Sequence, residues 1–423
     1  MEIVHIEETL VGDETIGEIC LGMIYASLAI TDNKKDTLKK IGETNPWHVE
    51  ALRIITGSEK EAQRPLRLIL SEDMDLTLDC IIDVTGITKG GHFLDTQGYI
   101  AHNNDVIVLS YRCTTSGFDW MTNFNATTSA WEVEHDVEEG YSGLCSGFEG
   151  LCCHKGEYKP RVHTGFYNNF LATLPLIQKH IEPRLASWQR PRKLYVVGHS
   201  LGAGIATMAG CYFLQKYDWT KMEHTLINAT YGSPRACCES MKVVMDKRRM
   251  EMGNKARMYR VVKGQDIVTT VPPKLFGFRH LVDPIVIWDD GRVVLKHKSV
   301  QNEPETDLVA LSRLHRGHEC VLSADLESDG QPTSYDRMIA RVPKALRDHM
   351  PDFYLKPLFK ANGIKLGSPT SCLSHEDDGV PTKDDDVPKK ALPEETKRGR
   401  PRKVWIPKMF RKRVEPVGPE LHW

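Results

Sequence analysis

The residues with the clearest chemical potential lie between Lys193 and Gly202. An apolar run to Val197 leads into the pattern Gly-x-Ser-x-Gly, with Ser200 at its centre, and a stretch rich in small residues follows. This order predicts a strand, a sharp turn and a helix, which would lift the serine hydroxyl above a sheet. A side chain at Gly198 or Gly202 would collide with neighbouring backbone in so tight a turn. We therefore interpret Ser200 as a nucleophile; the alternative is a small-residue turn that packs a helix on a strand.

A serine hydroxyl needs a base within hydrogen-bond reach, and the base needs an acid that fixes its tautomer. In sheets of this kind the chain order is serine, acid, histidine. Asp266 fits the acid because it follows an expected strand, in a turn that contains Gly264. A turn aspartate that caps its own backbone is the alternative. His349 is favoured as the base, because the aromatic and apolar segment after it can hold it in place. The weaker candidates for the base are His280, His297, His315 and His318.

Acyl transfer also needs donors for the negative oxygen of its intermediate. The backbone N–H of Leu201, the residue after the nucleophile, is one expected donor. Thr114 is the other, because it follows the strand expected at 105–111 and can offer both its N–H and its hydroxyl. An ordinary turn threonine is the alternative for Thr114.

Short β-prone runs alternate with helical stretches through the middle of the chain. The runs that we expect as strands lie at 79–84, 97–102, 105–111, 193–197, 225–231 and 257–262, with a hairpin at 281–295. This alternation predicts an α/β fold with a central, mostly parallel sheet and helices on both faces. Residues 16–30 and 46–56 are expected as helices that cover part of the core, and residues 126–160 as a long surface excursion.

The 423 residues suffice for one large domain with tails. We expect a helical covering segment at 1–75, a catalytic domain at 76–362 and a disordered basic tail at 363–423. The formal charge of −2 for the whole chain does not reveal how basic this tail is. Its residues 389–413 hold eleven Lys or Arg against two Glu. A solvated tail is the favoured interpretation, contact with an anionic surface comes next, and DNA binding is the weakest.

The amino end is acidic, unlike a secretory signal, and no apolar run reaches the length of a membrane span. Eleven cysteines without a regular framework are typical of reduced thiols, and the adjacent pair at 152–153 is poorly spaced for zinc. We expect a cytoplasmic protein without metal or cofactor, with membrane association left open.

Seven motifs, in order, resemble those of the class 3 lipases, the fungal-type triacylglycerol lipases. They lie at residues 111–120, 162–166, 197–202, 231–235, 262–273, 276–280 and 348–355. The resemblance implies an α/β-hydrolase fold and the hydrolysis of fatty-acid esters. Ser200 would attack the acyl carbon, His349 would move the proton, and Asp266 would orient His349.

The same resemblance implies an apolar lid after the oxyanion residue, with Phe118, Trp120 and Met121 closing over the pocket. Two departures stand out. Cys113 occupies a position where the family usually has glycine, and residues 202–204 read Gly-Ala-Gly where Gly-Gly-Ala is common.

We therefore expect a serine esterase that acts on acylglycerols, with a lipid ester as substrate and a membrane or lipid droplet as the surface it contacts. A phospholipase A1 or another carboxylesterase on the same site is the first alternative. A catalytically silent hydrolase scaffold that binds a partner is the second. Nucleic acid is not an expected partner, and the sequence does not predict an oligomeric state.

Overall fold

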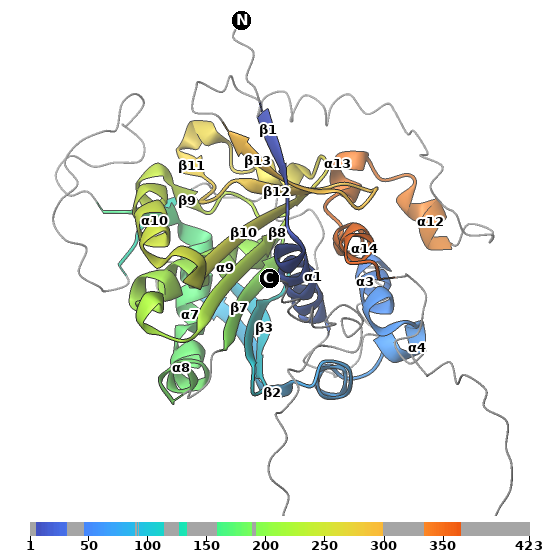
Figure 1. The fold of residues 1–423 in the computed structure, drawn as a ribbon, viewed down its shortest axis with the longest axis horizontal. Helices are drawn as coiled ribbons and strands as arrows, with labels where there is room; N and C mark the ends of the chain where they lie inside the picture. Colours follow the sequence, from blue (N-terminus) through green and yellow to red (C-terminus); the bar gives the residue numbers. More distant parts are fainter. Residues whose placement is uncertain are drawn as a thin grey trace, which may run out of the picture.

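The computed structural model describes residues 6–31, 46–88, 91, 93–113, 127–132, 159–187, 192–298 and 334–364. Within these residues a nine-stranded sheet has the order β1-β13-β12-β10-β8-β7-β4-β3-β2 (Figure 1). The pairs from β4 to β12 are parallel and those at both edges are antiparallel. The strands are β1 (Ile6–Leu10), β2 (Thr77–Ile87), β3 (Phe93–His102), β4 (Val106–Tyr111), β7 (Lys193–His199), β8 (Thr225–Tyr231), β10 (Ala256–Lys263), β12 (Pro284–Ile287) and β13 (Val293–Lys298).

Helices cover both faces of this sheet, as the alternation of strands and helices predicted. In Figure 1, α7, α9 and α10 lie to the left of the sheet and α1, α3 and α14 to the right. Neighbouring residues of one strand serve opposite faces: Tyr195 and Val197 join the core under α1, whereas Leu194 and Val196 join the core under α9. The helices are α1 (Asp13–Leu28), α3 (Pro46–Thr56), α4 (Glu59–Ala62), α5 (Leu66–Leu68), α7 (Thr164–His180), α8 (Glu182–Ser187), α9 (Leu201–Lys216), α10 (Glu239–Met252), α12 (Ser334–Ile339), α13 (Lys344–Arg347) and α14 (Pro351–Ala361).

The first part of the chain belongs to the same core. The helices predicted for residues 16–30 and 46–56 are present as α1 and α3. The sequence did not predict β1, which pairs antiparallel with β13 and becomes the edge of the sheet. The side chain of Asn362, just after α14, donates to the carbonyl of Ile16 in α1 at 3.4 Å, so both ends of the described chain meet on one face.

A second, four-stranded sheet flanks the first, in the order β11-β9-β6-β5. Its strands are β5 (Thr128–Ala130), β6 (Arg161–His163), β9 (Cys237–Cys238) and β11 (Phe278–Arg279). Trp131, directly after β5, is buried and stacks on Phe170 with ring centroids 6.0 Å apart. The expectation of a surface excursion is therefore wrong for residues 128–131, because an aromatic anchor ties them to the core; residues 133–158 lie outside the described chain.

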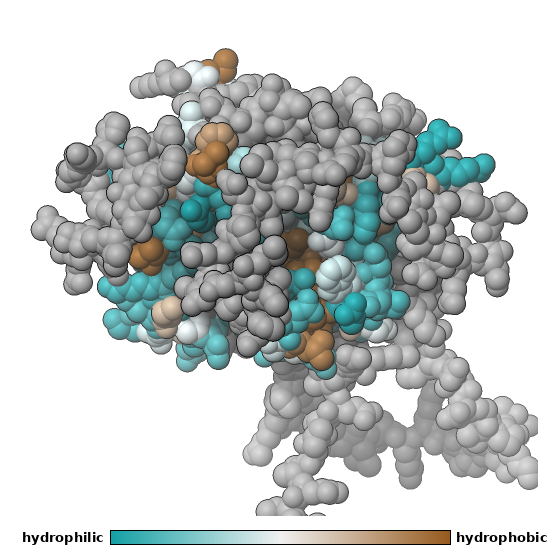
Figure 2. Space-filling model, turned by 90° about the horizontal axis from the view of Figure 1, so that it is seen from above, coloured by the Kyte–Doolittle hydropathy of each residue, from teal (hydrophilic) through white to brown (hydrophobic). Residues whose placement is uncertain are grey.

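The surface seen from above is mostly hydrophilic where its residues are described, with smaller hydrophobic areas between (Figure 2). Among the described helices, none has both the length and the apolar character that crossing a membrane requires.

Candidate active site

Ser200 sits in a strained turn between β7 and α9. Its φ of 58° and ψ of −124° are rare for a residue with a side chain. The turn is held because the Ser200 N–H donates to the carbonyl of Tyr231 at 2.9 Å. A Cβ atom at Gly198 would collide with the backbone of Gly202, and one at Gly202 would collide with the carbonyl of Tyr111. The predicted need for both glycines is confirmed.

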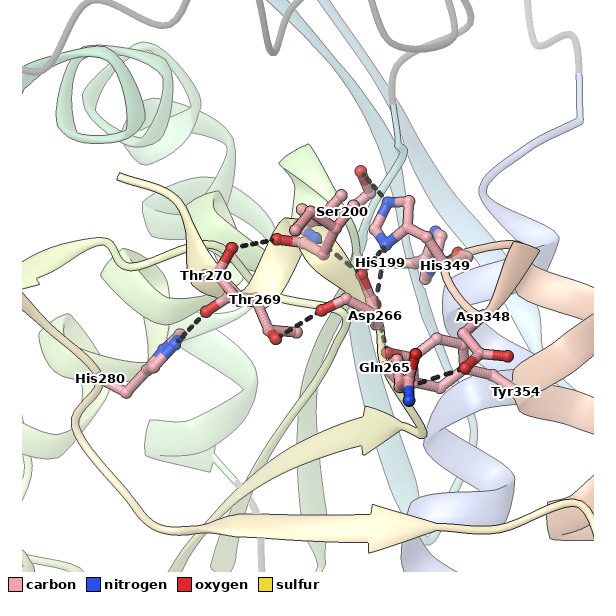
Figure 3. Close-up of polar contacts among 12 residues, drawn as sticks. His199, Ser200, Gln265, Asp266, Thr269, Thr270, His280, Asp348, His349 and Tyr354 are labelled. Carbon is pink, nitrogen blue, oxygen red and sulfur yellow. Dashed lines mark hydrogen bonds and ion pairs between the residues drawn. The ribbon is translucent and has the colours of Figure 1, made fainter. Parts of the chain in front are cut away.

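His349 connects the serine to the acid. Its Nε2 lies 2.8 Å from Ser200 Oγ, and its Nδ1 lies 2.9 Å from Asp266 Oδ2 and 3.0 Å from Oδ1 (Figure 3). A carboxylate accepts hydrogen bonds, so Nδ1 carries the proton and Nε2 is left as the acceptor for the serine hydroxyl. All three side chains are buried, with 2–6% of each residue exposed. The arrangement can activate a serine as a nucleophile.

The Asp266 carboxylate has two further donors. The Tyr354 hydroxyl, on α14, donates to Oδ2 at 2.6 Å, and the backbone N–H of Val268 donates to Oδ1 at 2.9 Å. The alternative role of Asp266 as a turn aspartate that caps its own backbone is thus present together with the contact to His349. Burial, followed by the charge of Asp266, raises the pKa of Tyr354 well above its usual value, so the hydroxyl stays protonated as a donor.

His199 supports His349 from behind. Its ring stacks on that of His349, with centroids 4.8 Å apart, and its Nε2 lies 2.8 Å from the backbone carbonyl of His349. A carbonyl only accepts, so His199 Nε2 is the donor. Burial, then the neighbouring His349, holds the pKa of His199 well below its usual value. His199 is therefore a neutral support for the base.

The motif at residues 162–166 supports the helix that begins at the serine. His163 Nδ1 accepts the N–H groups of Gly165 at 3.1 Å and Phe166 at 3.4 Å, which caps α7. The Phe166 ring then packs on Gly204, where an added Cβ would lie 2.5 Å from the ring. This contact explains the glycine at the third position of Gly-Ala-Gly.

The segment after β4 is described as far as Cys113. The Cys113 Sγ lies 3.4 Å from Nε2 of His48 on α3, and both side chains are buried. Burial raises the pKa of the Cys113 thiol to about 11, so it stays protonated near neutral pH. Burial, and then the charge of Arg112, lowers the pKa of His48 to about 3. A neutral pair thus fills the position where glycine was expected.

The remaining expectations divide into three groups. Leu201 is the first residue of α9, and the first N–H groups of a helix have no acceptor within it. Thr114 and the lid residues Phe118, Trp120 and Met121 lie outside the described residues, as do His315 and His318. His280 does not join the site, because its Nε2 donates to the carbonyl of Thr269 at 2.8 Å; His297 lies in β13.

Sequence reasoning missed the contact of Tyr354 with Asp266 and that of His199 with His349. A signal for the first was present in the aromatic segment after His349, but the partner lies 88 positions away. His199 stood beside the nucleophile, and only the fold shows that its ring faces the base.

A family model described as Lipase (class 3) matches residues 108–276. This part of the chain is similar to the class 3 lipases, in agreement with the motifs found in the sequence. The parallel strands at the centre of the main sheet, with helices on both faces, agree with the α/β-hydrolase fold that the sequence resemblance implied. The match includes Ser200 and Asp266 but ends before His349, whose place in the site rests on its hydrogen bonds to both residues.

Two curated proteins illustrate what the chain is similar to. Secreted mono- and diacylglycerol lipase 1 of Fusarium solani is 28% identical over 215 residues, covering 50% of this chain and 53% of that protein. A chloroplastic phospholipase A(1) of Arabidopsis thaliana is 25% identical over 171 residues, covering 39% of this chain and 33% of that protein. The chain therefore spans about half, or less, of the length of these relatives. Among solved structures, the lipase from Rhizopus microsporus var. chinensis is 18% identical, covers 73% of this chain and 87% of that chain, and has a TM-score of 0.45.

Proposed function

We propose that this protein is a serine esterase that hydrolyses fatty-acyl ester bonds of acylglycerols. The observation that carries the proposal is the hydrogen bonding of one histidine, His349, to both Ser200 and Asp266. These residues come from segments that are far apart in sequence and meet at one edge of the sheet. The family supports ester hydrolysis, and the name of the Fusarium relative supports mono- and diacylglycerols as substrates.

In the first step, Ser200 Oγ attacks the acyl carbon while its proton passes to His349 Nε2. Asp266 stabilises the resulting imidazolium and keeps its Nδ1 proton in place. The N–H of Leu201 and the N–H or hydroxyl of Thr114 bind the oxyanion. His349 then protonates the leaving alcohol, and a serine ester remains on the enzyme. Water, deprotonated by His349, releases the fatty acid in the second step.

A phospholipase A1 activity on the same site is the second candidate, favoured by the similarity to the Arabidopsis phospholipase A(1). The chemistry at the ester is the same, and only the group beside the scissile bond differs. Hydrolysis of diacylglycerol and of phosphatidylcholine, measured side by side, distinguishes the two candidates.

Contact with a lipid surface belongs to the same proposal, because acylglycerols gather in such surfaces. Leu275 and Phe276, which follow the loop of Asp266, are 67% and 46% exposed and support it. Lys274 adds a positive charge beside them. The turn is held from beneath, where Arg279 donates to the carbonyl of Lys274 at 3.0 Å.

Labelling with a fluorescent fluorophosphonate tests the nucleophile. The wild type should be labelled, Ser200→Ala should not, and His349→Ala should react at least about 100-fold more slowly because the serine loses its base. Ser233→Ala is the matched control, since Ser233 is also buried and lies beyond the end of the neighbouring strand β8. Persistent labelling of Ser200→Ala would refute the assignment. A folded wild type without labelling or hydrolysis would favour the silent scaffold.

A further inference from the structure

Four charged side chains gather behind the candidate site. Lys344 Nζ lies 3.0 Å from both carboxylate oxygens of Asp348. Lys263, at the end of β10, lies 2.6 Å from Asp289 and 3.9 Å from Asp348. Two cations and two anions thus balance, and we call these four residues the charge cluster. The mechanism proposed above uses none of them.

The inner members of the charge cluster are removed from water. The side chains of Lys263 and Asp348 are each 1% exposed, whereas Lys344 and Asp289 lie at the rim with 43% and 61% exposed. The pKa of Asp289 is lowered: burial acts in the opposite direction, but the hydrogen bond and charge of Lys263 outweigh it. A buried charge without its partner is strongly unfavourable, so the inner pair holds its position only when the segments are assembled.

Asp348 also contacts the loop that carries the acid. Its Oδ2 accepts the backbone N–H of Gln265 at 2.8 Å (Figure 3). Gly264, with a φ of 45°, lets the chain pass so close to Asp348 that a Cβ atom there would collide with the carboxylate. The acid loop is therefore shaped around the Asp348 carboxylate.

The register of these contacts matters. Gln265 precedes Asp266, and Asp348 precedes His349, so the contact between 265 and 348 lies one residue before the contact between acid and base. The segment that carries His349 is otherwise reached through residues 299–333, which lie outside the described chain. Asp348 is one of the points at which that segment is fixed to the end of β10.

We propose that Asp348 is a positioning residue, through which the charge cluster sets the distance and angle of His349 relative to Asp266. This inference rests on the proposed function, because it assigns Asp348 a role in serving the base. The polar contacts of Asp348 are with Gln265, Lys344 and Lys263, so it acts through these neighbours. A displacement of about 1 Å between reacting groups can lower a rate by about 100-fold.

The test compares Asp348→Asn, Asp348→Glu and Asp348→Ala on a water-soluble ester. Asn keeps an oxygen for the N–H of Gln265 but loses the charge, whereas Glu keeps the charge and displaces the contact. We expect kcat to fall about 10-fold for Asn and Glu and about 100-fold for Ala, with KM within about twofold of the wild type. Asp290→Asn is the matched control, because Asp290 lies in the adjacent hairpin turn with Arg292 as its ion-pair partner at 2.5 Å. It should leave kcat unchanged.

A structural role alone predicts a different result. In that case the variants would lower the melting temperature and leave kcat of the folded fraction unchanged, which would overturn the proposal. If Asp348→Ala does not fold, Asp348→Glu decides, and a wild-type kcat in that variant would equally overturn the proposal. Fluorophosphonate labelling of the wild type at Ser200 is recorded in parallel. Its absence would count against the proposed function, whereas labelled wild type with unaffected Asp348 variants would count only against the positioning role.

Discussion

At the scale of single residues, Tyr354 supports the group formed by Ser200, His349 and Asp266 without belonging to it. It does so through its hydrogen bond to Asp266. The Tyr354 ring packs edge-on against His199 and Tyr231, with centroids 5.6 Å and 6.3 Å away. The ring therefore has a packing role, and the hydroxyl has a separate role as a donor to the acid.

Tyr354→Phe separates these roles. The ring stays and the 2.6 Å hydrogen bond to Asp266 is lost. We expect kcat to fall about 3- to 30-fold, since a hydrogen bond to a charged group contributes roughly 1–2 kcal/mol, with little change in KM. Steady-state kinetics on a soluble ester measure this. Tyr99→Phe is the control, because its buried hydroxyl donates to the backbone carbonyl of Tyr25 and not to the acid. Equal losses of kcat in both variants would show a general effect on folding.

The same residues show how far sequence reasoning reaches. Ser200, Asp266 and His349 lie in short motifs whose local context predicted their roles as nucleophile, acid and base. The structure brings them within hydrogen-bond distance. Tyr354 and Asp348 could not be assigned contacts in advance. Their partners are set by how α14 and the segment before it dock on the end of β10, and the local sequence does not encode that docking.

At the scale of elements, α3 lies outside the residues that match the family, yet it contacts the segment after β4. The contact is made by His48, whose Nε2 lies 3.4 Å from the Sγ atom of Cys113. Because His48 is buried and neutral in the folded chain, it makes the free energy of unfolding depend on pH.

The sign follows from the two pKa values of His48. In the folded chain the value is about 3, from burial and the charge of Arg112, against an ordinary value of 6.5. The unfolded chain binds the extra proton between these values, so stability is complete above pH 6.5 and is lost as the pH falls towards 3. Between pH 7 and pH 5, His48 should account for a loss of roughly 2 kcal/mol. Urea unfolding of wild type and His48→Asn at both pH values measures the difference in slope. Identical slopes would contradict the prediction.

The strands divide into those that the sequence predicts and those that it does not. Apolar runs such as 105–111 and 225–231 carry their own β preference, and they form β4 and β8. The stretch Ile6–Leu10 contains two glutamates and forms β1 only because β13 offers an edge to pair with. Tertiary pairing decides such cases.

At the scale of the whole molecule, the exposed turn at Leu275 and Phe276 is the feature that bears on a lipid surface. Burying a Leu or Phe side chain in an apolar medium contributes about 1.5–3 kcal/mol. The double variant Leu275→Asp, Phe276→Asp should therefore bind vesicles of phosphatidylcholine and phosphatidylserine at least about 10-fold more weakly. Its kcat on a soluble ester should match that of the wild type.

Co-sedimentation with the vesicles measures this binding. Met250→Asp is the control, because Met250 is 77% exposed on α10 and should not matter. Equal binding of the double variant and the wild type would remove this turn from the lipid contact, whereas a loss in the Met250 variant alone would move the contact to α10.

The pairing of β1 with β13 also bears on how the chain is made. During synthesis β1 and α1 leave the ribosome before β13 and α14, yet Ile6 pairs with Lys298, and α1 packs against α14. The apolar face of α1, including Ile19, Met23 and Ile24, packs on α3 and β7 as well as on α14, so its partners are translated at widely separated times. The main sheet therefore cannot be completed from the amino end alone, because β1 has no partner strand until β13 has been translated.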